Sequence, residues 1–192
     1  MGETTRNINE KLIRKCREND RDAQFEIYRQ YYKQMYNTSL RIVNNTADAE
    51  DIMQDSFLDA FRKIGDYTGE GNFGGWLRRI VINNSLDALK KRKPEVMLQD
   101  DAVNVYETDD HAAENIEYRI EELKKAMKLL PEDDRVIISL FLFEGYDHEE
   151  ISGILKISYA ASRTRFSRAR QKLLATLSEQ RSIKIIHPNK TT

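Results

Sequence analysis

The sequence has one cysteine, few prolines and no long apolar run. Cys16 alone cannot form an internal disulfide or a thiolate cage for a metal ion from this chain. No stretch approaches the roughly 20 apolar residues that span a bilayer, and the N-terminus lacks the apolar core of a signal peptide. We therefore expect a cytoplasmic protein without membrane insertion, in which Cys16 is a half-buried small apolar side chain.

Strand-favouring runs are also scarce. The chain has only three prolines and eight glycines, whereas Leu, Ile, Ala, Glu, Lys and Arg recur at helical spacing along most of its length. We therefore predict an all-α fold. A chain of 192 residues can bury a real core, and this length fits two small helical domains joined by a linker.

The charges are sorted along the chain although the net charge is only −1. Residues 1–93 carry 17 basic and 14 acidic side chains, residues 94–115 carry 7 acidic and no basic ones, and residues 116–192 carry 14 and 11. Residues 94–115 have few apolar side chains, so they cannot bury enough apolar surface to offset the conformational entropy that ordering them would cost. We predict an N-terminal domain (1–93), an acidic flexible linker (94–115), a C-terminal domain (116–178) and a flexible tail (179–192).

A line of carboxylates follows one face of a predicted helix that begins near Thr46. Met53, Phe57 and Phe61 form the apolar stripe of this helix. Its acidic stripe consists of Asp48, Asp51, Asp55 and Asp59, with Gln54 alongside and no matching bases. Such a stripe is either a solubilising face or a docking surface for a basic helical partner, where charge complementarity gives specificity.

A glycine-rich loop over residues 65–75 precedes the next predicted helix, which runs from Trp76 to a basic end before Pro94. Aromatic, cationic and amide side chains gather there: Asn72, Phe73, Trp76, Arg79, Asn83 and Asn84. Such groups can hold separated DNA strands, because bases stack on aromatic rings. Trp76 could equally be a core residue, and no strand or Gly-Lys-Ser/Thr sequence supports a phosphate-binding enzyme loop.

The C-terminal block has the outline of a helix-turn-helix, with helices predicted from His148 to Leu155 and from Tyr159 to about Leu177. Six basic residues and no acid lie between Lys156 and Lys172. A recognition helix presents its first turns to the major groove and its flanks to phosphates. We predict base contacts from Tyr159, Ala160, Arg163 and Thr164, and phosphate contacts from Arg168 and Lys172. The alternative is a solvated basic face.

No constellation predicts catalysis, a metal site or a cofactor. The three histidines, His111, His148 and His187, lack metal-ligand spacing, and no nucleophile is paired with a base. We expect no enzymatic activity.

Three segments together resemble the extracytoplasmic-function sigma factors, the two-domain sigma subunits of bacterial RNA polymerase. Residues 49–58 are similar to the family segment that grips the clamp helices of the β′ subunit. Phe73, Trp76, Leu77, Ile80, Asn83 and Asp87 resemble its melting helix. Leu130-Pro131, Arg135, Gly145, Glu150-Ile151 and Ser167-Arg168-Ala169-Arg170 resemble its C-terminal domain. The resemblance covers about residues 8–178.

The resemblance implies a protein that binds core RNA polymerase and promoter DNA, promotes DNA opening, and contacts the β flap; an anti-sigma factor is a further possible partner. The implied polymerase contacts are Asp48, Glu50, Asp51, Gln54, Asp55 and Asp59. The implied −10 residues are Asn72, Phe73, Trp76, Arg79, Asn83 and Asn84, and the implied −35 residues are Tyr159, Ala160, Arg163, Thr164, Ser167, Arg168 and Lys172.

The chain departs from the family pattern at the turn of the helix-turn-helix. Lys156 stands where the family usually has Gly, Ser158 where Pro is common, and Ala161-Ser162 where Thr-Val is usual. The alternative functions are a stand-alone helix-turn-helix regulator, which leaves the glycine-rich loop and acidic stripe unexplained, and a nucleotide-processing enzyme, which needs catalytic pairs that the sequence lacks.

Overall fold

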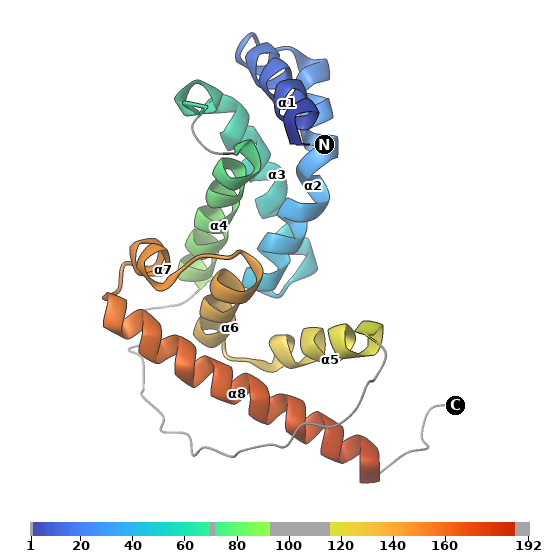
Figure 1. Cartoon of the computed structure of the whole chain (residues 1–192), viewed down its shortest axis with the longest axis vertical. Helices are drawn as coiled ribbons and strands as arrows, with labels where there is room; N and C mark the ends of the chain where they lie inside the picture. Colours follow the sequence, from blue (N-terminus) through green and yellow to red (C-terminus); the bar gives the residue numbers. More distant parts are fainter. Residues whose placement is uncertain (1, 70–71, 93–115, 187–192) are drawn as a thin grey trace. The chain divides into compact units, whose positions relative to one another are not determined.

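The computed structural model describes residues 2–69, 72–92 and 116–186, and all regular structure in these residues is helical. The chain divides into two compact units, Met1–Val96 and Met97–Thr192, which Figure 1 colours from blue to green and from yellow to red. The described residues confirm the predicted all-α class. The predicted linker, residues 94–115, lies outside them.

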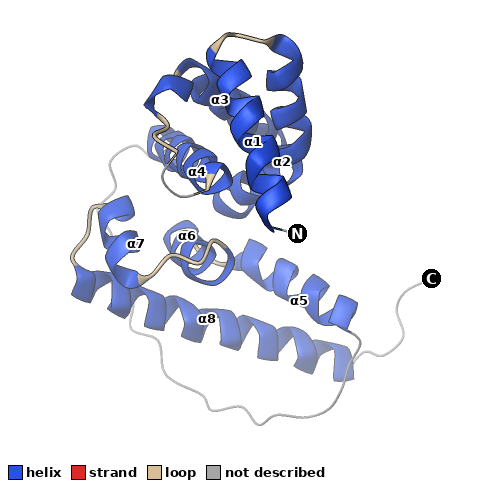
Figure 2. Ribbon diagram, turned by 45° about the horizontal axis from the view of Figure 1, so that its top comes forward, coloured by secondary structure: helices blue, strands red, loops and turns tan. Residues whose placement is uncertain are grey.

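The first unit contains four α-helices and a short 3-10 turn. They are α1 (Gly2–Arg17), α2 (Arg21–Val43), α3 (Thr46–Arg62), η1 (Ile64–Asp66) and α4 (Phe73–Arg92). Helix α2 packs against α1, α3 and α4, and α3 also packs against α4. Figure 2 shows the short loops that join α1 to α2 and α2 to α3.

Local signals explain where these helices begin and end. Asp20 caps α2, because its carboxylate accepts a hydrogen bond from the backbone N–H of Ala23 at 2.9 Å. Asn44 ends α2 in the left-handed conformation, which Asn tolerates. Asn45 then caps α3 by accepting from the N–H of Asp48 at 3.1 Å. The Asn-Asn pair thus makes a sharp reversal between two long helices.

The core of the first unit is apolar and aromatic. Met35, Phe57, Leu77 and Val81 are buried in it, and the rings of Tyr28 and Phe57 meet edge to face at 4.9 Å. Cys16 is fully buried rather than half-buried, and burial raises the pKa of its thiol to about 11. Cys16 therefore acts as a small core side chain that stays protonated at neutral pH.

The second unit is built on its last helix. Its elements are α5 (Ile116–Leu129), α6 (Glu132–Ile138), the π-helical turn η2 (Ser139–Phe143), α7 (His148–Leu155) and α8 (Tyr159–Ile186). Helices α5, α6 and α7 all pack along one side of α8, as Figures 1 and 2 show. The core of this unit includes Ile137, Leu140, Ile151 and Leu173.

Three boundaries differ from the sequence expectation. Helix α4 begins at Phe73 instead of Trp76, and the chain forms a π turn at Ser139–Phe143 that the sequence did not indicate. Helix α8 continues to Ile186, so the expected tail from residue 179 begins as helix. The sequence of this helix contains neither Gly nor Pro, and Pro188 is the next helix breaker along the chain.

Candidate functional site

Helix α3 turns an acidic face to solvent. Glu50, Asp51, Gln54 and Asp55 are all exposed, while Ile52, Met53, Ser56 and Phe57 on the opposite side are buried. The buried side fixes the rotation of the helix and therefore holds the acids outward. Among the residues that the structure describes, no ion pair neutralises Glu50, Asp51 or Asp55, so these three carboxylates present a local negative charge.

Two members of the predicted acidic stripe have basic partners, which corrects the expectation of a stripe without matching bases. Asp48 forms an ion pair with Arg92 at the end of α4. Asp59 lies 3.5 Å from Arg62, one helical turn away, and also accepts a hydrogen bond from Asn84. These two carboxylates stabilise the α3–α4 packing, and the unpaired charge is concentrated between them.

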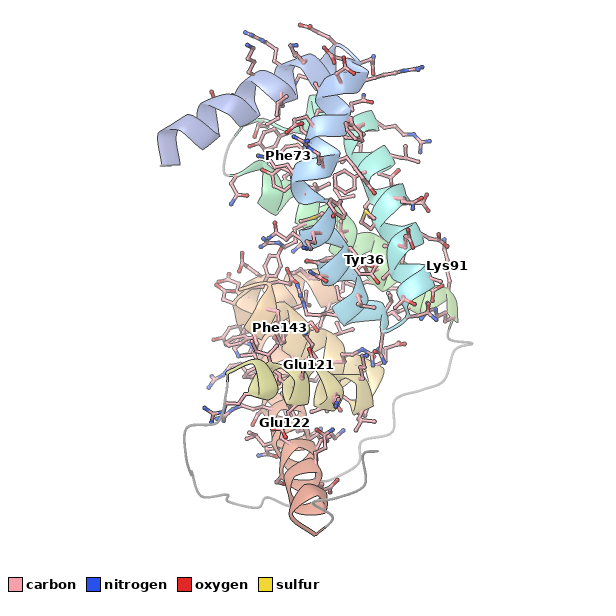
Figure 3. All side chains as sticks on the ribbon, turned by 90° about the vertical axis from the view of Figure 1, so that its right-hand side faces the viewer. Tyr36, Phe73, Lys91, Glu121, Glu122 and Phe143 are labelled. Carbon is pink, nitrogen blue, oxygen red and sulfur yellow. The ribbon has the colours of Figure 1, made fainter. Side chains whose placement is uncertain are left out.

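An open groove of about 430 Å³ runs beside this acidic face, between α3 and α4. Leu58 lines it and is 54% exposed, so the groove offers one accessible large apolar side chain among mainly polar neighbours. Asp55 and Asp87 supply acids to its wall, and Arg62 and Lys91 supply bases. Figure 3 labels Lys91 near the end of α4. The groove therefore combines apolar contact with charges of both signs.

The start of α4 is held by a side-chain cap and a close helix contact. The carboxamide oxygen of Asn72 accepts a hydrogen bond from the N–H of Gly75 at 2.6 Å. Gly74 lies so near Tyr31 of α2 that an added Cβ would be 2.9 Å from the ring. A side chain at this position would force Tyr31 or the helix to move, so glycine allows the start of α4 to lie close to α2.

Three aromatic rings cluster at this end of α4. The centroids of Tyr67, Phe73 and Trp76 are 5.5 Å apart in each pair. Phe73 is buried among the helices of the first unit, where Figure 3 labels it, and Trp76 is half-buried. The Phe73 ring is therefore not accessible in this structure and packs against Trp76, which keeps an accessible surface; a contact of Phe73 with DNA stays a prediction.

The predicted melting residues separate into two faces of α4. Asn72, Trp76, Arg79 and Asn83 follow the spacing of one face, and Asn72 and Asn83 are exposed. Asn84 points elsewhere: its amide donates to Ser56 Oγ at 3.1 Å and to Asp59 at 3.2 Å. Asn84 therefore holds α3 to α4, which favours a structural role, and its contact with DNA stays a prediction.

Sequence reasoning missed Arg17, which supports this end of the unit from α1. Its guanidinium donates hydrogen bonds to the carbonyl oxygens of Tyr67, at 2.5 Å, and Ile64, at 3.4 Å. Ile64 directly precedes the glycine-rich loop over residues 65–75, and Tyr67 lies in the first part of that loop. The separation of 50 residues left no local signal for this contact.

The helix-turn-helix is held by strong local caps. The Asp147 carboxylate accepts hydrogen bonds from the N–H groups of Glu149 and Glu150 at 2.8 Å each. The Glu150 carboxylate in turn accepts a hydrogen bond from the N–H of Asp147, and the two residues form a capping box. Lys156 ends α7 with φ of 55°, in the left-handed region. Ser158 then caps α8 by accepting from the N–H of Ala161 at 3.1 Å.

The exposed face of α8 brings together most of the predicted −35 residues. Ala160, Arg163, Thr164, Ser167, Arg168 and Gln171 line a shallow hollow of about 500 Å³. Tyr159 is exposed beside it, and the guanidinium carbon of Arg163 lies 6.0 Å from the centre of its ring. This face carries positive charge and hydrogen-bonding groups, and the major groove of DNA is wide enough to admit an α-helix.

Lys172 does not belong to that face. Its Nζ lies 2.8 Å from Asp134 of α6, and the two side chains are only 30% and 15% exposed. The pair links α6 to α8, which favours a packing role for Lys172, and its phosphate contact stays a prediction. The sequence spacing places Lys172 one turn beyond Arg168, but α6 packs against α8 so that Asp134 forms an ion pair with Lys172.

The described residues contain no group of three or more His, Cys, Asp or Glu side chains placed to hold a metal ion. No helix among them is long and apolar enough to cross a membrane.

Two family matches cover these two units. Residues 27–95 match Sigma-70 region 2, and residues 120–173 match Sigma-70, region 4. Region 2 thus spans the acidic face and the aromatic end of α4, and region 4 spans the helix-turn-helix.

Similar curated proteins are RNA polymerase sigma factors. The ECF RNA polymerase sigma-E factor of Haemophilus influenzae is 32% identical over 173 residues, which cover 83% of this chain and 90% of that protein. The RNA polymerase sigma-H factor of Pseudomonas aeruginosa is 28% identical over 179 residues, which cover 87% and 92%.

Solved structures share the fold. CnrH, solved in complex with the cytosolic domain of CnrY, superposes with a TM-score of 0.55 at 21% identity over 88% of this chain and 96% of CnrH. The sigma factor RpoE of Bartonella quintana, solved with the anti-sigma factor NepR, also gives a TM-score of 0.55 at 21% identity, over 80% and 95%.

Two helical units that match Sigma-70 regions 2 and 4 define a sigma factor, a protein that directs RNA polymerase to promoters. Within that class, the chain belongs to the extracytoplasmic-function (ECF) family of RNA polymerase sigma factors.

Proposed function

We propose that three helices of this sigma factor each present one face to a different target during transcription initiation. The single observation that supports this proposal most directly is that α3, α4 and α8 each combine a buried apolar side with an exposed polar face of distinct chemistry. The face of α3 is acidic, that of α4 combines an aromatic ring with amides, and that of α8 is basic. We infer no catalytic activity, and we expect the protein to act in the cytoplasm, where polymerase and promoter DNA meet.

The acidic face of α3 docks on core polymerase in this proposal. Glu50, Asp51, Gln54 and Asp55 are exposed and suit the basic helical clamp of the β′ subunit. Leu58 in the neighbouring groove adds an apolar contact, which strengthens a charge-steered interface. Asp48 and Asp59 act through the packing of α3 on α4 instead of through direct contact.

The start of α4 holds unpaired −10 DNA. Trp76 offers a half-exposed ring for base stacking, which is worth ~1–3 kcal/mol per base. Asn72, Arg79 and Asn83 lie on the same face and can bind base edges or phosphates. This stabilisation is needed because extruding a base from a duplex costs about a few kcal/mol.

The exposed face of α8 reads the duplex −35 element. Tyr159, Ala160, Arg163 and Thr164 in its first turns approach base edges, and Ser167 and Arg168 approach the DNA backbone. Leu142 and Phe143, which are exposed on the second unit, offer an apolar surface for the β flap. The similar sigma factor RpoE was solved in complex with the anti-sigma factor NepR, so we also propose that an anti-sigma factor binds this chain.

Reconstituted transcription tests the proposal. Core polymerase with the protein should initiate at selected promoters and render −10 thymines reactive to permanganate, whereas core polymerase alone should not. The protein alone should bind duplex promoters poorly, because polymerase must hold the two DNA-reading units together for their weak contacts to add. Tight duplex binding without polymerase, and no gain in transcription with it, would favour a stand-alone regulator.

A further inference from the structure

His148 lies at the junction between α7 and the first turns of α8. Its Nδ1 and the hydroxyl of Ser162 share a hydrogen bond of 3.1 Å, whose direction depends on the histidine tautomer. Ser162 is fully buried, at 0% exposure. A buried hydroxyl without a partner is unfavourable, so this bond selects one orientation of α8 relative to α7.

Aromatic rings surround the imidazole and restrict its movement. Phe141 of η2 lies 4.8 Å from it in a tilted arrangement, and Phe166 of α8 meets it edge to face at 5.4 Å. Phe141 and Phe166 also contact each other at 4.3 Å. His148 therefore contacts a preceding helical turn and two successive turns of α8 at once.

The backbone of His148 is itself rigidly placed. It is the first residue of α7, directly after Asp147, whose capping box fixes this end of the helix. The imidazole consequently projects from a fixed point toward α8, and its contacts can set the position of the first turn of that helix.

The same imidazole contacts the exposed reading face. Tyr159, which is 53% exposed, meets His148 edge to face at 6.2 Å. The guanidinium carbon of Arg163 in turn lies over the Tyr159 ring, 6.0 Å from its centre. A continuous series of contacts thus joins the buried Ser162 hydroxyl, through His148 and Tyr159, to Arg163.

We propose that His148 is a positioning residue for promoter recognition: with Ser162 it sets the rotation of the first turns of α8 and so the direction in which Tyr159 and Arg163 meet the bases. This role rests on the proposed function of α8 as the −35 reader. His148 touches no DNA in it and acts through Tyr159 and Ser162.

Base selection by the reconstituted holoenzyme provides the test. A promoter library randomised in the −35 element is incubated with holoenzyme, and the bound fraction is sequenced. His148→Phe keeps a ring but removes the nitrogen, and Ser162→Ala removes only the hydroxyl. Each should reduce discrimination at one or two base positions by roughly fivefold to tenfold, within the range that one base contact supplies. The double variant should lose no more than the stronger single one, because both remove the same bond.

Lys172→Met is the matched control. It also removes a polar tie between α8 and the rest of the unit, but farther from the first turns. It should lower the unfolding midpoint and leave the order of preferred bases unchanged. Altered preference in the control as large as in His148→Phe would overturn the proposal, as would unchanged preference in both single variants. If His148→Phe does not fold, Ser162→Ala and the control decide the question.

The base preference of the wild-type holoenzyme distinguishes a failure of the −35 role of α8 from a failure of the His148 role. A holoenzyme without any −35 preference would remove the proposed function of α8 and this role with it. A clear wild-type preference that Ser162→Ala and His148→Phe both retain would remove only the role of His148.

Discussion

Arg17 and Tyr67 are joined by a hydrogen bond of 2.5 Å from the guanidinium to the backbone carbonyl oxygen. The Tyr67 ring packs on Trp76, so this bond connects α1 to the proposed −10 site. Arg17→Met keeps the aliphatic stem and removes the donors. We expect about 1 kcal/mol less stability and several-fold weaker binding of a single-stranded −10 oligonucleotide by the holoenzyme.

Arg14→Met on the same helix is the control for this prediction, because Arg14 is also exposed. It should leave oligonucleotide binding unchanged, as measured by fluorescence anisotropy. Equal losses from the two variants would show that net charge, and not the contact with Tyr67, is responsible.

Gly74 allows α4 to approach α2. In Gly74→Ala the new Cβ would lie 2.9 Å from the Tyr31 ring, so the ring or the helix must move. We expect a loss of about 1–3 kcal/mol in the free energy of unfolding, measured by urea denaturation. Gly75→Ala is the comparison: its nearest neighbour would be at 3.4 Å, an ordinary contact, and its stability should stay near that of the wild type.

Lys156 adopts a backbone conformation that favours glycine, with φ of 55°. The residue typical of the family at this place is therefore the one that the geometry prefers. Lys156→Gly should raise the free energy of unfolding by about 1 kcal/mol, because the left-handed conformation strains residues that have a Cβ. Lys156→Ala should give no such gain. A stabilised alanine variant would point to the lysine charge as the cause.

The salt dependence of DNA binding separates Lys172 from Arg168. Arg168→Met should lower the slope of log K against log salt by about 1, as expected for one lost phosphate contact. Lys172→Met should leave this slope unchanged, since Lys172 is paired with Asp134. Binding titrations of holoenzyme on one promoter at several salt concentrations give both slopes. A smaller slope for Lys172→Met would restore the original sequence prediction.

The helix boundaries of this protein were largely predictable because local residues determine them. Asp147 and Ser158 are strong cap residues, and α7 and α8 begin at His148 and Tyr159 as the sequence indicates. The far end of α8 was not predictable, because its sequence has no stop signal near Leu177. The π turn at Ser139–Phe143 was missed for a similar reason: an apolar run there fits either helix type.

The exposed sites were less predictable than the helices. The first turns of α4 carry apolar or aromatic residues on several sides, so the sequence alone could not show that Phe73 faces the core and Trp76 the surface. Asn84, Asp48 and Lys172 take partners 25 to 44 residues away, and helix packing creates those pairs. A local charge pattern contains no information about them.

Capture of core polymerase by the acidic face of α3 tests the central claim most directly. Asp51→Lys with Asp55→Lys reverses two exposed carboxylates of α3, and Glu18→Lys with Glu179→Lys changes the net charge equally at exposed sites outside α3. Co-purification of each double variant with core polymerase is measured against the wild type. The account predicts loss of capture for the α3 variant alone; normal capture by that variant, or equal loss in both, would contradict it.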